Sequence, residues 1–136
     1  MLDSNIVIDL TSGYDEEFTE ASLSCMARLS TRGPFWINHI IYAEVAPRTQ
    51  DRAGMDRQLA VLNIRLVGLN ADDAWRAGLA FHRYRQRRGP RESILPDFLI
   101  GGQAAARGWP IITRDPRRFA SYFPELQIID PTEAAA

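Results

Sequence analysis

The sequence predicts an α/β fold in which a mostly parallel central sheet is covered by helices on both faces. Short apolar runs that suit strands alternate with longer stretches whose apolar residues recur every three or four positions, as in amphipathic helices. No hairpin turn of the Asn-Gly type separates the strand-like runs, so helical crossovers must join them, which favours parallel strands. A chain of 136 residues can bury its own core, and we expect one domain over residues 1–136.

Residues that cap or stop helices mark the borders of the expected elements. Asn38 suits a helix N-terminus because its side chain can accept backbone N–H groups, and Pro96 suits a first turn because no N–H is needed there. The expected strands are a very short one that begins at residue 2 and turns at Asn5, and those over 35–37, 110–113 and 126–129, with a strand or extended connector over 64–69. The expected helices cover 16–31, Asn38 to about Val45, 51–63, Asn70 or Asp72 to before Gly89, Pro96 to about Arg107, and Pro116 to about Tyr122.

Composition excludes several classes of protein. No apolar run approaches the roughly 20 residues that a membrane span requires, so we expect no membrane protein. The first residues lack the basic and apolar regions of a secretory signal, and a cytoplasmic location is therefore expected. The single cysteine, Cys25, lies at helical spacing from Phe18 and Leu29, which indicates a buried thiol rather than a catalytic one.

The two histidines do not predict a zinc site. His39 has no second histidine nearby, and neither has His82. His82 follows Trp75 and Leu79 on the apolar stripe of the long helix, so we expect it in the core or in an interface.

Four acidic residues stand where apolar segments meet the expected loops. Asp3 lies in the first strand-like segment, and Asp115 follows the apolar strand over 110–113. Asp97 lies in the first turn of an apolar helix. Glu44 is the one acidic residue of another apolar helix, which starts at Asn38. Separately, Asp97 and Asp115 could simply suit helix N-termini. Together the four predict one acidic pocket, because ligands of open α/β sheets bind beyond the carboxyl ends of the strands.

Carboxylates that share a pocket require a compensating cation. An unpaired buried carboxylate costs several kcal/mol, and neighbouring carboxylates repel one another. Mg²⁺ or Mn²⁺, which take hard oxygen ligands, would relieve that repulsion. Such an ion can activate a water and neutralise a phosphodiester during in-line displacement. The acids therefore predict a divalent metal site, and a purely structural cation is the competing interpretation.

The acidic segments resemble the four signatures of the PIN-domain family. Their order and spacing match, and the end of the chain is also similar to VapC-type toxins of that family. The resemblance covers essentially the whole chain. Only two residues precede Asp3 where several are usual, so we expect either that the sequence starts late or that the first strand is shortened. Asn38 stands where Ser or Thr is common. The matching segments are 2–6, 38–45, 95–101 and 112–115, followed by Phe119, 123–126 and 130–131.

This resemblance implies a three-layer α/β/α PIN-like fold and an endoribonuclease that uses Mg²⁺ or Mn²⁺. Asp3 and Asp97 would be the main metal ligands, with Glu44 and Asp115 completing the cluster directly or through water. The family's toxins are typically homodimers and are inhibited by a cognate VapB-like antitoxin, whose C-terminal segment lies in the active-site groove. The positions that match supporting residues, which would orient the carboxylates, are Asn5 and Thr113.

A cluster of arginines has two interpretations. All 16 basic residues are arginine, the net charge is −1, and five arginines fall within nine positions. Basic residues at a helix end suit the helix dipole and need no further role. We slightly favour a track that binds RNA phosphates on the way to the acids, with Tyr84 stacking on a base. The five residues are Arg83, Arg85, Arg87, Arg88 and Arg91.

Two other classes of protein compete with a metal-dependent endoribonuclease. Receiver domains and haloacid-dehalogenase-like phosphatases also place aspartates around Mg²⁺, but they typically require a lysine, and this chain has none. A catalytically inactive PIN-like module that binds RNA or protein would have lost an acid, and all four are present. The sequence therefore favours the toxin nuclease of a type II toxin–antitoxin pair.

Overall fold

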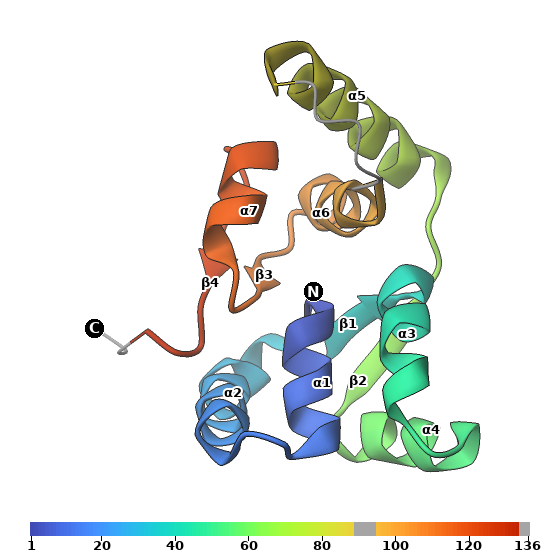
Figure 1. The fold of residues 1–136 in the computed structure, drawn as a ribbon, viewed down its shortest axis with the longest axis vertical. Coiled ribbons are helices and arrows are strands. Elements are labelled where there is room, and N and C mark those ends of the chain that lie inside the picture. The colour runs from blue at the N-terminus through green and yellow to red at the C-terminus, as the bar shows by residue number, and fades with distance from the viewer. Residues whose placement is uncertain (89–94, 134–136) are drawn as a thin grey trace.

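The computed structural model describes residues 1–88 and 95–133. It confirms the predicted alternation of helices and strands (Figure 1). The strands are β1 (Phe35–Asn38), β2 (Ile64–Val67), β3 (Ile111–Ile112) and β4 (Ile128–Ile129). The helices are α1 (Ser4–Ser12), α2 (Glu16–Leu29), α3 (His39–Val45), α4 (Arg52–Val61), α5 (Ala71–Arg88), α6 (Leu95–Arg107) and α7 (Pro116–Tyr122), with short 3₁₀ helices η1 (Ser30–Arg32) and η2 (Ala46–Arg48).

The strands pair in parallel, as predicted. β1 pairs with β2, and β3 pairs with β4. The first residues of the chain run between these pairs: the Leu2 N–H donates to the Trp36 carbonyl and the Asp3 N–H to the Ile112 carbonyl, each over 2.9 Å. Leu2 therefore links the two pairs in the order β2, β1, Leu2, β3, β4, through its bridge to Ile112 of β3 and its hydrogen bond to Trp36 of β1.

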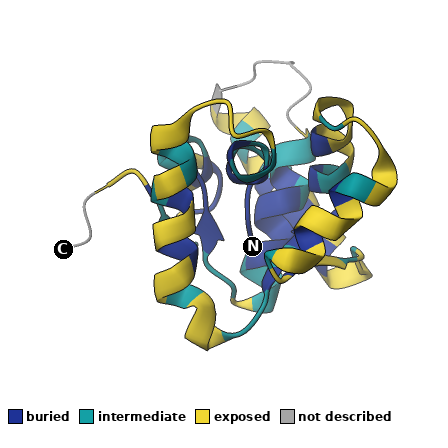
Figure 2. Cartoon of the chain, turned by 90° about the horizontal axis from the view of Figure 1, so that it is seen from below, coloured by how far each residue is buried: buried dark blue, intermediate teal, exposed yellow. Residues whose placement is uncertain are grey.

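Apolar side chains from helices and strands form the core between these elements. Ile6 of α1, Ile41 of α3 and Ile100 of α6 are fully buried with Ile37 of β1 and Ile111 of β3. Figure 2 shows buried residues on the strands and the inward helix faces, and exposed residues on the outward faces. In the part of the chain that the structure describes, no helix combines the length and apolarity needed to cross a membrane.

The first strand is shorter than predicted, and a helix replaces most of it. Only Leu2 forms a strand bridge, and α1 begins at Ser4, where the Asp3 carboxylate accepts the Ser4 N–H over 2.8 Å. The β-branched residues Ile6 and Val7 favour a strand locally. They are nevertheless fully buried on α1, because tertiary packing overrides weak local propensity.

The apolar stripe expected on α5 does not lie in the core of this chain. Trp75 and Leu79 are 69% and 41% exposed, and His82 is also exposed. Small residues face α6 instead: a Cβ added at Gly102 would lie 2.8 Å from the Ala77 Cα. A helix contact this close excludes large side chains, so the periodicity of the large apolar residues indicated the wrong face. The buried residues of α5 are Asp73, Ala77 and Ala80.

Candidate active site

Three of the predicted acids converge on one guanidinium group. Asp3 precedes α1, Asp97 lies in the first turn of α6, and Asp115 precedes α7. The Arg118 Nη2 lies 2.9 Å from Asp3 Oδ2, its Nη1 lies 3.6 Å from Asp97 Oδ2, and its Nε lies 3.6 Å from Asp115 Oδ2. Segments more than 90 residues apart in the chain therefore meet in one acidic pocket.

The fourth acid joins this pocket through α1. Glu44 is exposed near the end of α3, and the Ser4 hydroxyl donates to its Oε1 over 2.5 Å. Ser4 directly follows Asp3, so this bond fixes Glu44 next to the buried aspartate. Asp3 and Asp115 thus lie where parallel strand segments end, as the topology predicted, and Asp97 and Glu44 join them from α6 and α3.

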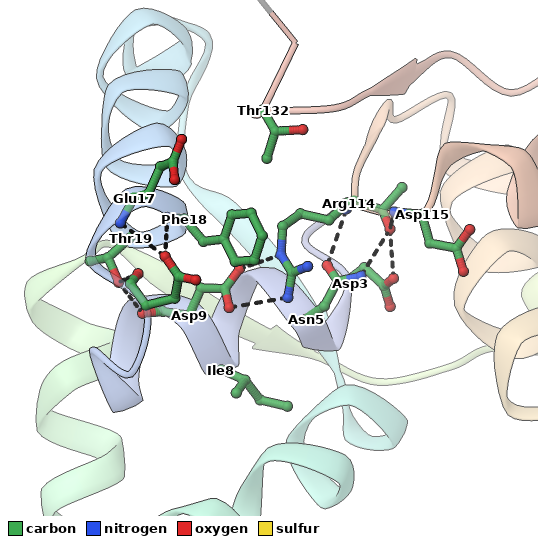
Figure 3. Close-up of polar contacts among 12 residues, drawn as sticks. Asp3, Asn5, Ile8, Asp9, Glu17, Phe18, Thr19, Arg114, Asp115 and Thr132 are labelled. Atoms are coloured by element: carbon green, nitrogen blue, oxygen red, sulfur yellow. Dashed lines mark hydrogen bonds and ion pairs between the residues drawn. The ribbon is translucent and has the colours of Figure 1, made fainter.

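A buried hydroxyl orients Asp3. Thr113, fully buried after β3, donates to Asp3 Oδ2 over 2.8 Å and accepts the Asp115 N–H over 3.0 Å. Asn5 Nδ2 donates to the same hydroxyl over 3.4 Å, and the side-chain Oδ1 of Asn5 accepts the Arg114 backbone N–H over 3.3 Å. Figure 3 shows Asp3, Asn5, Arg114 and Asp115 side by side at this junction. Asn5 and Thr113 therefore stand where they can position the acids.

The helix-capping explanation does not account for Asp115. Asp115 occupies the N-cap position of α7, but its side chain makes no capping hydrogen bond. Its carboxylate is half-exposed and points to Arg118 instead. Asp3 does cap α1, yet only through Oδ1, while Oδ2 contacts Thr113 and Arg118.

The pocket carries more negative charge than its arginine balances. Burial raises the pKa of Asp97 from 3.8 to about 6, against the attraction of Arg118, and the charges of Asp3, Glu44 and Asp115 raise it further. Both burial and like charges disfavour an ionised carboxylate. One guanidinium therefore leaves Asp97 in a strained electrostatic environment that a further cation would relieve.

The donor chemistry fits a hard divalent cation, although the acids are not arranged around one. Carboxylates supply oxygen ligands suited to Mg²⁺ or Mn²⁺, and burial, followed by the charges of the neighbouring acids, raises the pKa of Asp97. Among the residues that the structure describes, however, no three acidic, histidine or cysteine side chains form a group ready to hold a metal ion. Arg118 lies between the aspartates instead.

Sequence reasoning missed Arg118. Its position three residues after Asp115 on α7 is the spacing at which side chains of a helix meet, and this signal could have identified it. Its contacts with Asp3 and Asp97 had no local signal, because they depend on how α7 packs beside α1 and α6.

The described arginines of the cluster lie on α5, a helix that carries none of the four acids. The side chains of Arg83, Arg85 and Arg87 are exposed, and Arg87 Nη2 donates to the Ser121 carbonyl of α7 over 3.2 Å. Tyr84 is half-buried: its ring lies 5.7 Å from that of Phe98 and 5.0 Å from that of Tyr122, so it belongs to an aromatic cluster instead of standing free among the arginines. The Arg88 side chain and Arg91 lie outside the described residues.

Several solved structures have similar folds, among them a structure described as a toxin–antitoxin complex from Klebsiella pneumoniae, with a TM-score of 0.63 and 24% identity over 98% of each chain. VapBC-1 from nontypeable Haemophilus influenzae matches with a TM-score of 0.71 and 20% identity over 98% of each chain. VapBC2 from Rickettsia felis, bound to a promoter DNA fragment, matches with a TM-score of 0.70 and 16% identity over 94% of this chain and 95% of that one. DNA-bound VapBC from Salmonella typhimurium matches with a TM-score of 0.68 and 22% identity over 96% of each chain.

Sequence comparison assigns the family. No curated protein matches the chain. The model of the PIN domain matches residues 1–122, which include all four acids and Arg118. The chain therefore belongs to the PIN-domain family, and its α/β fold with parallel strands is the PIN fold.

Proposed function

We propose that this chain is a metal-dependent endoribonuclease and the VapC-type toxin of a type II toxin–antitoxin pair. The observation that carries the proposal is the convergence of Asp3, Asp97 and Asp115 on one pocket, with Glu44 beside them. Nucleases are general in the PIN family, and divalent metal ions are their general cofactors. Endoribonuclease action with Mg²⁺ or Mn²⁺ is the specific form that we propose.

Each acid has a distinct part in this proposal. Asp3 and Asp97 would hold the metal because both are screened from solvent, whereas Glu44 and Asp115 are more exposed and would act directly or through water. When bound, the metal would activate a water and neutralise the scissile phosphate. Thr113 keeps Asp3 oriented by hydrogen bonding to Oδ2.

RNA cleavage tests the proposal directly. Total RNA is a suitable substrate, since it contains transfer, ribosomal and messenger RNA together. We expect cleavage with Mn²⁺, no cleavage with EDTA, and a loss of at least about 100-fold in D97N, because a metal ligand is removed. D72N, an exposed acid on α5, is the matched control and should cleave normally. Intact cleavage by D97N would favour a purely structural cation instead.

We further propose that the chain binds a VapB-like antitoxin and forms a homodimer. The similar solved structures, which are VapBC complexes, support the antitoxin partner, and the homodimer rests on the family resemblance alone. Co-expression with the product of a small neighbouring gene for a DNA-binding protein should yield a stable complex that does not cleave RNA. Light scattering should give twice the monomer mass for the purified toxin. A monomer that no such protein inhibits would contradict this part of the proposal.

A further inference from the structure

Arg118 engages the oxygen atoms that a metal ion would need. Asp3 Oδ1 accepts the Ser4 N–H, and Asp3 Oδ2 accepts both the Thr113 hydroxyl and Arg118 Nη2. A carboxylate oxygen offers two lone-pair sites, so Oδ2 is fully engaged. The Arg118 Nη1 also faces Asp97, the other expected main ligand.

Arg118 and a divalent ion cannot hold these positions together. Both are cations that would contact the same carboxylates, and a guanidinium stays protonated at any ordinary pH, so Arg118 cannot leave by losing its proton. Its side chain must move instead. The side chain is 30% exposed, which leaves a route towards solvent.

The Nε atom of Arg118 indicates that the guanidinium is not fully hydrogen-bonded in its present position. Among the residues that the structure describes, the buried Nε has no hydrogen-bond partner, and it lies 3.6 Å from Asp115 Oδ2. A buried donor without a partner is costly. The contact between Arg118 and Asp3 is close, but those with Asp97 and Asp115 are long, so part of the interaction is weak.

We propose that Arg118 is an internal counter-cation of the metal-free pocket, displaced from Asp3 and Asp97 when a divalent ion binds. Arg118 is thus a positioning residue that keeps the acids together without metal and lowers their affinity for metal. This inference rests on the proposed function, because it requires that the wild-type protein binds Mg²⁺ or Mn²⁺ at these acids.

The test compares R118Q with R117Q, an exposed neighbour on α7. Mn²⁺ affinity is measured by calorimetry, and stability by thermal unfolding in EDTA. We expect R118Q to unfold at a lower temperature than wild type in EDTA and to bind Mn²⁺ at least about tenfold more tightly, the effect that one adjacent charge commonly has on an ionic equilibrium. R117Q should match wild type in both measurements.

A second measurement uses the wild-type protein and does not depend on how R118Q folds. In ¹⁵N-labelled protein, the Arg118 Nε–H signal, assigned by its loss in R118K, should shift as Mg²⁺ is added and saturate with the binding curve. The Arg117 signal should not move. A metal-saturated protein whose Arg118 signal is unchanged would overturn the inference.

The outcomes separate this inference from the proposed function. If wild type binds metal and cleaves RNA while R118Q binds metal equally or more weakly, the inference is wrong and the proposed function stands. If wild type neither binds metal nor cleaves RNA, both fail. Tighter metal binding by R118Q together with lower stability in EDTA supports Arg118 as the internal counter-cation, because a merely structural role would weaken metal binding.

Discussion

The Arg114 guanidinium binds Asp9 through two hydrogen bonds, with Nε 2.6 Å from Oδ2 and Nη2 3.2 Å from Oδ1 (Figure 3). The Asp9 side chain is 9% exposed, and the guanidinium carbon lies 4.1 Å above the Phe18 ring. The pair fastens α1 to the segment between β3 and α7. Asp3 lies directly before α1, and Asp115 lies at the end of that segment. The Arg114–Asp9 pair therefore supports the acidic pocket from one side.

We expect R114Q to lower the free energy of unfolding by about 2–3 kcal/mol, because Asp9 would keep a buried charge without its partner. Urea unfolding measures the change. R52Q is the matched control, because Arg52 and Asp56 form an exposed ion pair whose side chains are 86% and 49% exposed. Loss of this ion pair should change the free energy of unfolding by less than about 0.5 kcal/mol. Equal effects of the two substitutions would contradict the structural role of the Arg114 pair.

Thr113 should support metal binding through its hydroxyl. T113V keeps the shape but removes the donor to Asp3 and the acceptor of the Asp115 N–H. We expect a loss of about 1–2 kcal/mol in stability and about a tenfold loss of Mn²⁺ affinity in calorimetry. T113S retains the hydroxyl and should bind Mn²⁺ nearly as wild type does. An unchanged affinity in T113V would show that Asp3 needs no such partner.

The close contact between α5 and α6 should make Gly102 intolerant of substitution. A Cβ there would lie 2.8 Å from the Ala77 backbone, so the helices must separate. We expect G102A to reduce the free energy of unfolding by about 1–3 kcal/mol. Gly78 of α5 is the contrasting position, because an added Cβ would meet none of the described atoms outside its own helix backbone within 4 Å, and G78A should gain about 0.5–1 kcal/mol. Urea unfolding of both variants checks whether G102A lowers and G78A raises the free energy of unfolding.

Asp97 should make the metal-free protein less stable as the pH rises. Its pKa increases from 3.8 to about 6 on folding, mainly through burial, so folding favours the protonated form. The stability that it contributes is present below pH 3.8 and is lost as the pH rises through about 6. In EDTA, D97N should therefore be more stable than wild type at pH 7.5, by on the order of 1 kcal/mol after solvent screening.

The same D97N gain should largely disappear near pH 4.5, where wild-type Asp97 is mostly protonated. Thermal unfolding across this pH range measures the difference between the two proteins. A gain that does not depend on pH would show that the substitution acts through something other than the charge of Asp97.

The exposed arginines of α5 should contribute to RNA binding if they contact phosphates. RNA affinity is measured in the D97N background, which prevents cleavage, over a series of salt concentrations. Adding R85E and R87E should weaken binding at low salt and reduce the slope of log affinity against log salt by about 1.5, because each of the two lost phosphate contacts removes about 0.7–0.9. Reversal of Arg32 and Arg57, exposed arginines of η1 and α4, is the control. Unweakened binding in the α5 variant would refute the phosphate track.

Local signals in the sequence determined most elements and the acids themselves. Asn38 caps α3 through bonds to the N–H groups of Ile40 and Ile41, and Gly108, with a positive φ of 65°, follows the end of α6. These features depend on neighbours within a few residues, which the sequence displays directly. Parallel topology then implied that Asp3 and Asp115 meet, because the carboxyl ends of parallel strands share one edge.

Only the tertiary structure decided the features that depend on distant partners. Ile6 and Val7 are helical although they favour a strand locally, because the helix α1 places both side chains in the core. The small residues of α5 are buried because Gly102 allows α5 and α6 to approach each other closely. Arg118 entered the acidic pocket through its contact with Asp3, 115 positions away in the chain. Sequence periodicity records which residues are apolar or charged, but the partner that each one meets depends on distances between elements that no local pattern contains.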